Sequence, residues 1–95
     1  MALVSVKIML FATLRSKYKT RELTVACDGT LQSMIENASK ILGQEFVDDV
    51  YDKKRGKVRD DMIIMVNGRN IKDLEGEIIL KDNDVIAIFS PLAGG

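Results

Sequence analysis

The final stretch of the chain reads Asn83-Asp84-Val85-Ile86-Ala87-Ile88-Phe89-Ser90-Pro91-Leu92-Ala93-Gly94-Gly95. The apolar run at 85–89 predicts a strand, because turn-forming residues precede it. Pro91 lacks an N–H and biases the residue before it toward extended geometry, and two terminal glycines tolerate almost any backbone torsion. We therefore expect a folded domain over residues 1–89 and a flexible C-terminal tail over residues 90–95.

The opening segment alternates in polarity. From Leu3 to Phe11, one set of alternate side chains is wholly apolar, as in a half-buried strand. We expect this set to face the core: Val4, Val6, Ile8 and Leu10. Residues 15–20 are mostly polar and predict a loop, and residues 21–25 predict a second strand that pairs with the first.

The strongest helical pattern begins after Asp28-Gly29-Thr30. These residues favour a turn, and the Thr30 hydroxyl is a suitable N-cap. Apolar residues then recur at the spacing of one helical face: Leu31, Met34, Ile35, Ala38, Ile41 and Leu42. Gly43 follows where a left-handed C-terminal cap belongs. The stripe predicts a helix that packs on the core.

The second half of the chain is mainly strand-like. Residues 46–51 indicate a short helical turn, and residues 52–61 are charged and predict a mobile loop. Residues 62–66 predict a strand, which Asn67-Gly68 turns into a hairpin. The resulting fold class is α+β, a mixed sheet of four to five strands with one main helix on one face.

Composition limits the class of partner. The 95 residues carry 14 Lys plus Arg and 14 Asp plus Glu, so no overall field favours nucleic acid or an anionic membrane. The basic residues between Lys53 and Arg59 are flanked by aspartates on both sides and lack stacking aromatics, which favours a solvated loop over a nucleic-acid site. A single cysteine fits a reducing interior, so we expect the cytoplasm. The opening strand is too short and too interrupted for a signal peptide or membrane anchor.

The side chains offer little catalytic chemistry. The chain has no His, and it lacks both glycine-rich nucleotide loops. Asp82 and Asp84 open like a calcium loop but lack its later ligands, which favours a turn. The acidic pairs at 48–49 and 60–61 are interpreted as solubilising surface groups. Cys27 precedes a helix and is either an activated thiol or, as we favour, a small buried side chain. We expect this chain itself to bind no cofactor and no metal.

Several segments together resemble the MoaD/ThiS family of ubiquitin-like sulfur carriers, whose fold is the β-grasp, and the match is closest to the small subunits of molybdopterin synthase. The matching segments cover most of the chain: Leu10-Phe11-Ala12-Thr13-Leu14-Arg15, Asp28-Gly29-Thr30-Leu31, Val66-Asn67-Gly68 and residues 83–95. The charged segment from Lys53 to Asp61 looks longer than in the shortest members.

The resemblance implies a function for the tail. An E1-like adenylyltransferase would use ATP to adenylate the Gly95 carboxylate, and a sulfur donor system would convert it to a thiocarboxylate. The protein would be a non-catalytic carrier subunit, and the large subunit of molybdopterin synthase would use the sulfur to convert precursor Z to the dithiolene pterin. Gly94, Ala93, Leu92 and Pro91 would thread into the partner's active site.

Docking requires a surface next to the tail. If the first strand faces the core as described, Met9 and Phe11 point outward, and Phe89 joins them in an apolar patch that binds the partner. Three alternatives share the tail chemistry: a carrier for tRNA thiolation, a carrier for thiamine synthesis, and a modifier conjugated to lysines. A fourth, of a different class, is a non-catalytic β-grasp interaction module. The sequence leaves open the pathway, the sulfur donor, conjugation, the oligomeric state and the role of Cys27.

Overall fold

The structure is a computed structural model that describes residues 3–74 and 76–90. Its elements in chain order are β1 (Val4–Phe11), α1 (Ala12–Tyr18), β2 (Glu22–Cys27), α2 (Leu31–Leu42), α3 (Glu45–Val50), β3 (Tyr51–Asp52), β4 (Lys57–Val58), β5 (Ile63–Val66), β6 (Arg69–Asn70), the 3-10 helix η1 (Ile71–Asp73) and β7 (Val85–Phe89). The predicted tail residues from Pro91 onward lie outside the described residues.

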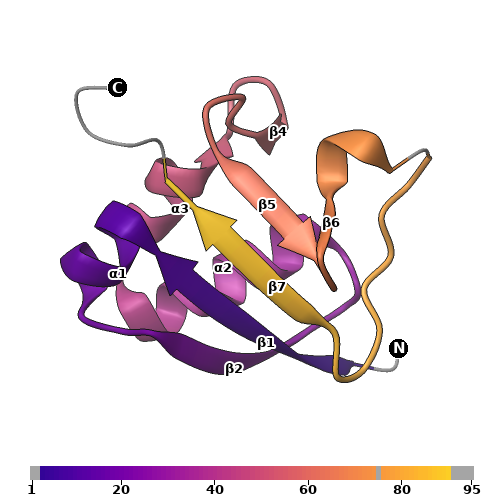
Figure 1. Ribbon diagram of the computed structural model, residues 1–95, viewed down its shortest axis with the longest axis horizontal. Helices are drawn as coiled ribbons and strands as arrows, with labels where there is room; N and C mark the ends of the chain where they lie inside the picture. Colours follow the sequence, from indigo (N-terminus) through magenta and orange to yellow (C-terminus); the bar gives the residue numbers. More distant parts are fainter. Residues whose placement is uncertain (1–2, 75, 91–95) are drawn as a thin grey trace.

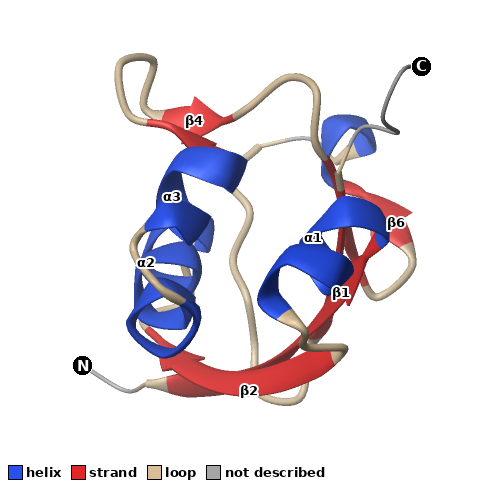
Figure 2. Ribbon diagram, turned by 90° about the vertical axis from the view of Figure 1, so that its left-hand side faces the viewer, coloured by secondary structure: helices blue, strands red, loops and turns tan. Residues whose placement is uncertain are grey.

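One mixed sheet forms the centre of the fold, as predicted. Its five strands lie in the order β2-β1-β7-β5-β6, and β3 pairs with β4 separately. The β1–β7 pair is parallel and the other pairs are antiparallel. Figure 1 shows these strands with α2 and α3 behind them, and Figure 2 shows the sheet and the helices as two layers. The sheet therefore has one face covered by helices.

The covered face of the sheet holds the core. Val6, Ile8 and Leu10 of β1 are at most 1% exposed, which confirms three of the four inward-facing residues predicted for this strand. Val4, near the start of the strand, is half-buried and packs against the same core. Each fully buried aliphatic side chain contributes about 1.5–3 kcal/mol through removal of apolar surface from water. The alternation in the sequence therefore sets which face is covered.

The main helix, α2, begins and ends where predicted. The Thr30 hydroxyl accepts a hydrogen bond from the Ser33 N–H at 3.1 Å, which confirms the N-cap. Gly43 ends the helix with φ 122° and ψ 152°, outside the left-handed helical region that was predicted. Ile41, predicted to face the core, is 63% exposed. The prediction for Ile41 was wrong because the buried face of the helix is centred further toward Ser39. Ser39 is only 9% exposed, and Ile41 lies on the opposite side of this face, in solvent.

Residues 15–20 do not form the loop that was predicted, because α1 continues through Tyr18. Leu14 anchors this helix in the core at 3% exposure. The Tyr18 ring packs edge-on against Phe46 of α3, with ring centroids 5.5 Å apart. Lys19 then stops the helix with a left-handed φ of 52°. Contacts with a distant helix thus stabilise a segment whose own sequence favoured a loop.

The second half contains two hairpins. The short helical turn predicted after Gln44 is confirmed as α3. The charged segment that follows is partly ordered, because Tyr51 pairs with Val58 and the Arg59 N–H donates to the Val50 carbonyl at 2.9 Å. The tight turn predicted at Asn67-Gly68 is confirmed, because both residues have positive φ, at 51° and 87°. This turn lets β5 pair with β6. Within the described residues, no helix has the length and apolarity needed to cross a bilayer.

Candidate functional site at the open sheet face and the root of the tail

The outer face of the sheet carries apolar side chains at the end where β1 and β7 finish. Their parallel register places Phe11 beside Phe89, and the rings stack with centroids 4.5 Å apart and planes inclined by 9°. On the other side of β7, Ile63 pairs with Phe89 and Met65 pairs with Ala87. Met9 also pairs with Ala87. Three strands therefore contribute to a continuous surface.

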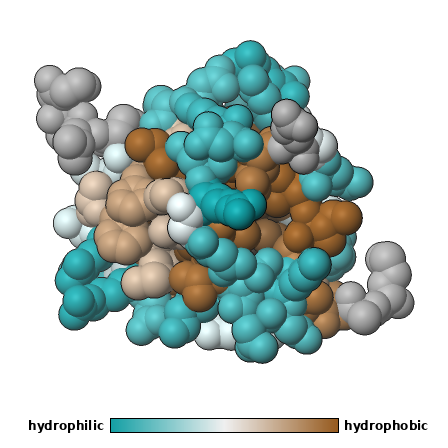
Figure 3. Space-filling model, turned by 45° about the vertical axis from the view of Figure 1, so that its right-hand side comes forward, coloured by the Kyte–Doolittle hydropathy of each residue, from teal (hydrophilic) through white to brown (hydrophobic). Residues whose placement is uncertain are grey.

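We call this surface the apolar patch, made of Met9, Phe11, Ile63, Met65, Ala87 and Phe89. Ile63 is 44% exposed and the others are half-buried. In Figure 3 apolar side chains gather on this side of the molecule, with hydrophilic groups around them. The sequence indicated Met9, Phe11 and Phe89, and the structure brings those three together. Ile63 and Met65 were missed, because the dense apolar run at 62–66 does not reveal which residues face outward.

Charged side chains bound the patch toward β2. The Lys7 ammonium lies 3.3 Å from the Glu22 carboxylate, and both side chains are about half exposed. Lys7 is the outward-facing residue of β1 that comes before Met9. The apolar patch therefore stops at Met9 along this strand. An exposed pair of this kind contributes little to stability. Its effect is to give the patch a polar boundary on this side.

The root of the tail is fixed next to the patch. Ser90 follows Phe89 directly, and its hydroxyl accepts a hydrogen bond from the Thr13 N–H at 3.1 Å. The hydroxyls of Thr13 and Ser90 also contact each other. Thr13 lies two residues after Phe11, at the start of α1, and Ser90 follows Phe89. The contact between Thr13 and Ser90 is therefore next to the stacked rings of the patch. The predicted functional residues Pro91, Leu92, Ala93, Gly94 and Gly95 lie outside the described residues.

A charged cluster lies behind the root of the tail. The Asp49 carboxylate accepts hydrogen bonds from the Lys17 ammonium at 2.8 Å and the Tyr18 hydroxyl at 2.5 Å. Burial alone would raise the pKa of Asp49, but the bonds from Lys17 and Tyr18 outweigh it and lower the pKa. The bond to Asp49 and then the one to Glu45 raise the pKa of Lys17, while burial and then the Asp49 bond raise the pKa of Tyr18. Asp49 therefore links α1 to α3, which corrects its interpretation as a solubilising group.

A small cavity connects this cluster to the tail root. It has a volume of about 300 Å³ and is lined by Thr13, Leu14, Lys17, Asp49, Arg59, Met62 and Ser90. Arg59 donates to the Asp61 carboxylate at 2.7 Å. The cavity thus has charged walls, whose groups already have bonding partners, and an apolar floor formed by Leu14 and Met62.

The other candidate groups are structural. Cys27 is fully buried and pairs with Val4, at the opposite end of β1 from Phe11, which confirms the interpretation as a small buried side chain. Asp84 accepts from the Lys81 N–H at 2.8 Å, as expected of a turn, whereas Asp82 accepts from the Ser5 N–H at 2.7 Å and ties the turn to the first strand. Among the described residues no cluster of three or more His, Cys, Asp or Glu has the geometry to hold a metal ion.

Comparison with known proteins identifies the family of the chain. The model of the ThiS family matches residues 8–95, which is nearly the whole chain. The chain belongs to the ThiS/MoaD family of ubiquitin-like sulfur carriers. It is 32% identical to the molybdopterin synthase sulfur carrier subunit of Drosophila melanogaster, over 97% of this chain and 92% of that protein.

Several solved structures share the fold. Small archaeal modifier protein 1 from Methanosarcina acetivorans superposes with a TM-score of 0.77, at 30% identity and full coverage of both chains. A chain in the BexX/CysO complex of Amycolatopsis orientalis gives a TM-score of 0.74 at 20% identity, over 95% of this chain and 99% of that one. The latter likeness concerns the fold alone. The β-grasp fold predicted from the sequence is confirmed.

Proposed function

We propose that this ThiS-family protein carries sulfur on the carboxyl group of Gly95 and delivers it in molybdopterin synthesis, as the small subunit of a molybdopterin synthase. One observation carries the proposal: the apolar patch lies at the end of β7, directly beside the residue from which the tail departs. The match of the family model through Gly95 and the similarity to the Drosophila subunit support it.

The proposed chemistry requires an activated acyl group, because a carboxylate is a poor electrophile. A Gly95 carboxylate oxygen attacks the α-phosphate of ATP in the activating enzyme, which gives the acyl-adenylate and releases pyrophosphate. Hydrosulfide supplied by a donor then attacks the acyl carbon, AMP departs, and the proton is released to water. This leaves a thiocarboxylate on the carrier. The ATP is bound by the activating enzyme, and the carrier contributes only the terminal acyl group.

The patch and the tail have separate roles in this proposal. The patch, which includes Met9, Phe11 and Phe89, holds the partner against the sheet. The tail residues Pro91, Leu92, Ala93 and Gly94 then reach into the partner's active site, where small side chains offer little steric resistance. The partners are the activating adenylyltransferase and the large synthase subunit. Both must accommodate the same root geometry at Ser90.

A second candidate is conjugation of Gly95 to lysine side chains. It is favoured by the 30% identity to a protein named small archaeal modifier protein 1. The activation step is the same, and only the nucleophile differs, because a lysine amine replaces the sulfur donor. Thiolation of tRNA and thiamine synthesis would use the same thiocarboxylate with other acceptors.

Intact-mass analysis tests the chemistry. Incubation with ATP, the cognate activating enzyme and sulfide should produce a species about 16 Da heavier, because sulfur replaces one oxygen. The same reaction with a chain lacking Gly95 should give no such species. A lysine isopeptide to Gly95 in place of the mass shift would support the modifier function. An unchanged mass for the wild-type chain with an active enzyme contradicts both.

Binding measurements test the patch. Phe11→Lys should weaken affinity for the large synthase subunit by about tenfold or more, since a charge is placed within an apolar interface. Leu3→Lys is the matched control, because Leu3 is 64% exposed and lies before β1, at the opposite end of that strand from Phe11. Calorimetric titration should find its affinity within about twofold of wild type. Equal affinities for the two variants would remove the patch from the proposal.

A further inference from the structure

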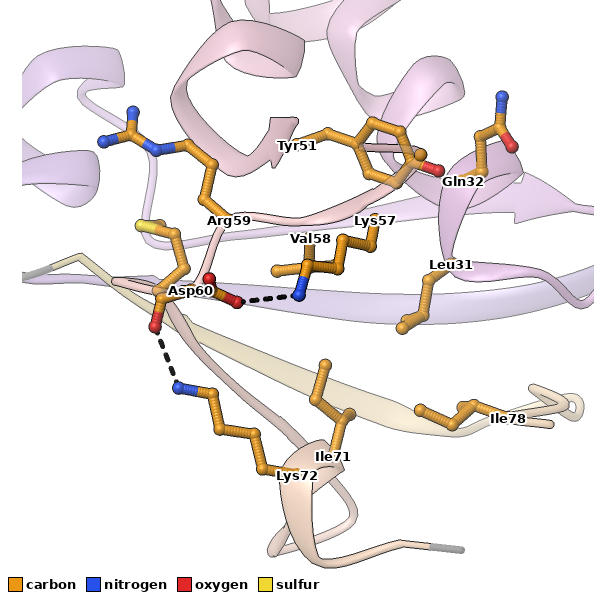
Figure 4. Close-up of a pocket in the computed structure, with 12 residues that line it drawn as sticks. Leu31, Gln32, Tyr51, Lys57, Val58, Arg59, Asp60, Ile71, Lys72 and Ile78 are labelled. Carbon is orange, nitrogen blue, oxygen red and sulfur yellow. Dashed lines mark hydrogen bonds and ion pairs between the residues drawn. The ribbon is translucent and has the colours of Figure 1, made fainter. Parts of the chain in front are cut away.

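A second cavity lies beneath the β3–β4 hairpin. Its volume is about 350 Å³, within the range of about 300–1,000 Å³ common for binding pockets. Its floor is apolar and is formed by residues from separate segments of the chain: Leu31, Val58, Met62, Ile71 and Ile78. Figure 4 shows Leu31, Ile71 and Ile78 directed toward a shared space below the hairpin. The hairpin closes one side of this space and η1 the other.

Positive side chains gather along one edge of the cavity. The Lys57 ammonium lies 3.1 Å from one Asp60 carboxylate oxygen, and Arg55 donates to the other at 2.7 Å. Lys72 donates to the Asp60 backbone carbonyl at 2.8 Å, a neutral acceptor (Figure 4). The Asp60 carboxylate thus pairs with two cations, while among the described residues the Lys72 ammonium bonds only a carbonyl. The edge retains positive charge and N–H donors that face solvent, which is complementary to a carboxylate.

The cavity is separate from the apolar patch. None of its lining residues belongs to the patch, because Met62 points into the core at 2% exposure and Ile63 points to the opposite face of the sheet. A molecule bound beneath the hairpin leaves Phe11 and Phe89 uncovered. Both surfaces can therefore be occupied at once.

We propose that this cavity docks a peptide segment of a protein partner in which an apolar side chain is flanked by carboxylates. The apolar side chain fills the space between Leu31, Ile71 and Ile78, and the carboxylates reach Lys57 and Lys72. Burial of the peptide's apolar side chain provides affinity. The two lysines disfavour peptides whose neighbouring residues are basic or neutral. The carrier is thereby held by one protein while its sheet face and tail serve another.

Two synthetic peptides test the proposal on the full chain. The probe is acetyl-Glu-Glu-Leu-Phe-Glu-Glu-amide, and its control replaces each Glu with Lys. In ¹H–¹⁵N NMR titrations to millimolar concentration, the acidic peptide should shift the amide signals of Val58, Ile71 and Ile78 and leave those of Phe11 and Phe89 in place. Equal binding of the basic peptide, shifts confined to the apolar patch, or no shifts at all would each overturn the proposal.

Matched charge variants separate the docking edge from general electrostatics. Lys57→Gln combined with Lys72→Gln should weaken binding of the acidic peptide by about five- to tenfold. Lys40→Gln combined with Lys81→Gln removes the same charge from exposed positions outside the cavity and should change affinity less than twofold. Equal weakening by both pairs would show that only net charge matters and would contradict the site. Deletion of Gly95 should leave peptide binding intact, so this test is independent of the sulfur-carrier proposal.

Discussion

The two faces of the central sheet are built from the same strands and have different fates. On the inner face, Ile8, Ile86 and Ile88 are completely buried under the helices. On the outer face, the neighbouring residues of those strands form the apolar patch, with Phe11 and Phe89 left half-exposed. Helix packing accounts for the apolar character of the first face. The second face has no such covering within the described residues, which supports the proposal that it binds a partner.

The largest difference between the faces should appear on truncation of adjacent residues in β7. Ile88→Ala removes a fully buried side chain and should lower the free energy of unfolding by about 2–5 kcal/mol, because the core cannot fill the resulting cavity. Phe89→Ala, at the next residue, should lower the free energy of unfolding by only about 1 kcal/mol. The Phe89 side chain is half-buried, so its truncation removes less buried apolar surface, together with one stacking contact. Urea denaturation measures both. A larger loss at Phe89 than at Ile88 would reverse the assignment of the two faces.

A smaller effect on stability is expected from the contact between α1 and α3, which Asp49 makes with Lys17 and Tyr18. Asp49→Asn weakens the bonds from Lys17 and Tyr18 and should lower the free energy of unfolding by about 1–2 kcal/mol at neutral pH. Asp48→Asn is the control, because Asp48 is exposed and its substitution should stay within about 0.5 kcal/mol.

The contribution of Asp49 should depend on pH. The folded protein lowers the pKa of this carboxyl, so its stabilisation is present above the unfolded value of about 3.9 and disappears as the pH falls through the lower folded pKa. The stability difference between wild type and Asp49→Asn should therefore shrink in acid. A difference that stays constant from neutral pH to below pH 3 would show that the charge of Asp49 is not responsible.

The smallest effect concerns the stacked pair itself. A double-mutant cycle of Phe11→Ala and Phe89→Ala should give a coupling energy of about 0.5 kcal/mol in folding, since the pair is partly exposed to water. The same cycle measured in partner binding should give a larger coupling, because the interface excludes water from both rings. A coupling in folding above that in binding would indicate that the rings serve the fold.

Local patterns predicted much of this fold. The alternation from Val4 to Leu10, the Thr30 cap and the Asn67-Gly68 turn each depend on neighbours in sequence, and all three were found. The helix α1 was missed in part because its stability comes from distant contacts, such as Tyr18 with Asp49 and Thr13 with Ser90.

The candidate site was predictable only where strand order could be inferred. Phe11 and Phe89 were expected on one surface because the first and last strands were taken as neighbours. Ile63 and Met65 join the patch through the β5–β7 pairing, which links residues more than twenty positions apart and leaves no local signal. The cavity beneath the hairpin was missed for the same reason, since Leu31, Val58 and Ile78 meet only after folding.

The placement of β7 between β1 and β5 has a consequence for biosynthesis. Residues 85–89 supply the middle of the sheet, so a nascent chain or fragment that stops before Val85 leaves two strands with open edges that cannot pair with each other. We expect such fragments to stay unfolded and therefore to be open to proteolysis. We therefore expect that a folded molecule of this protein has been translated past Phe89, because β7 is needed to join β1 to β5.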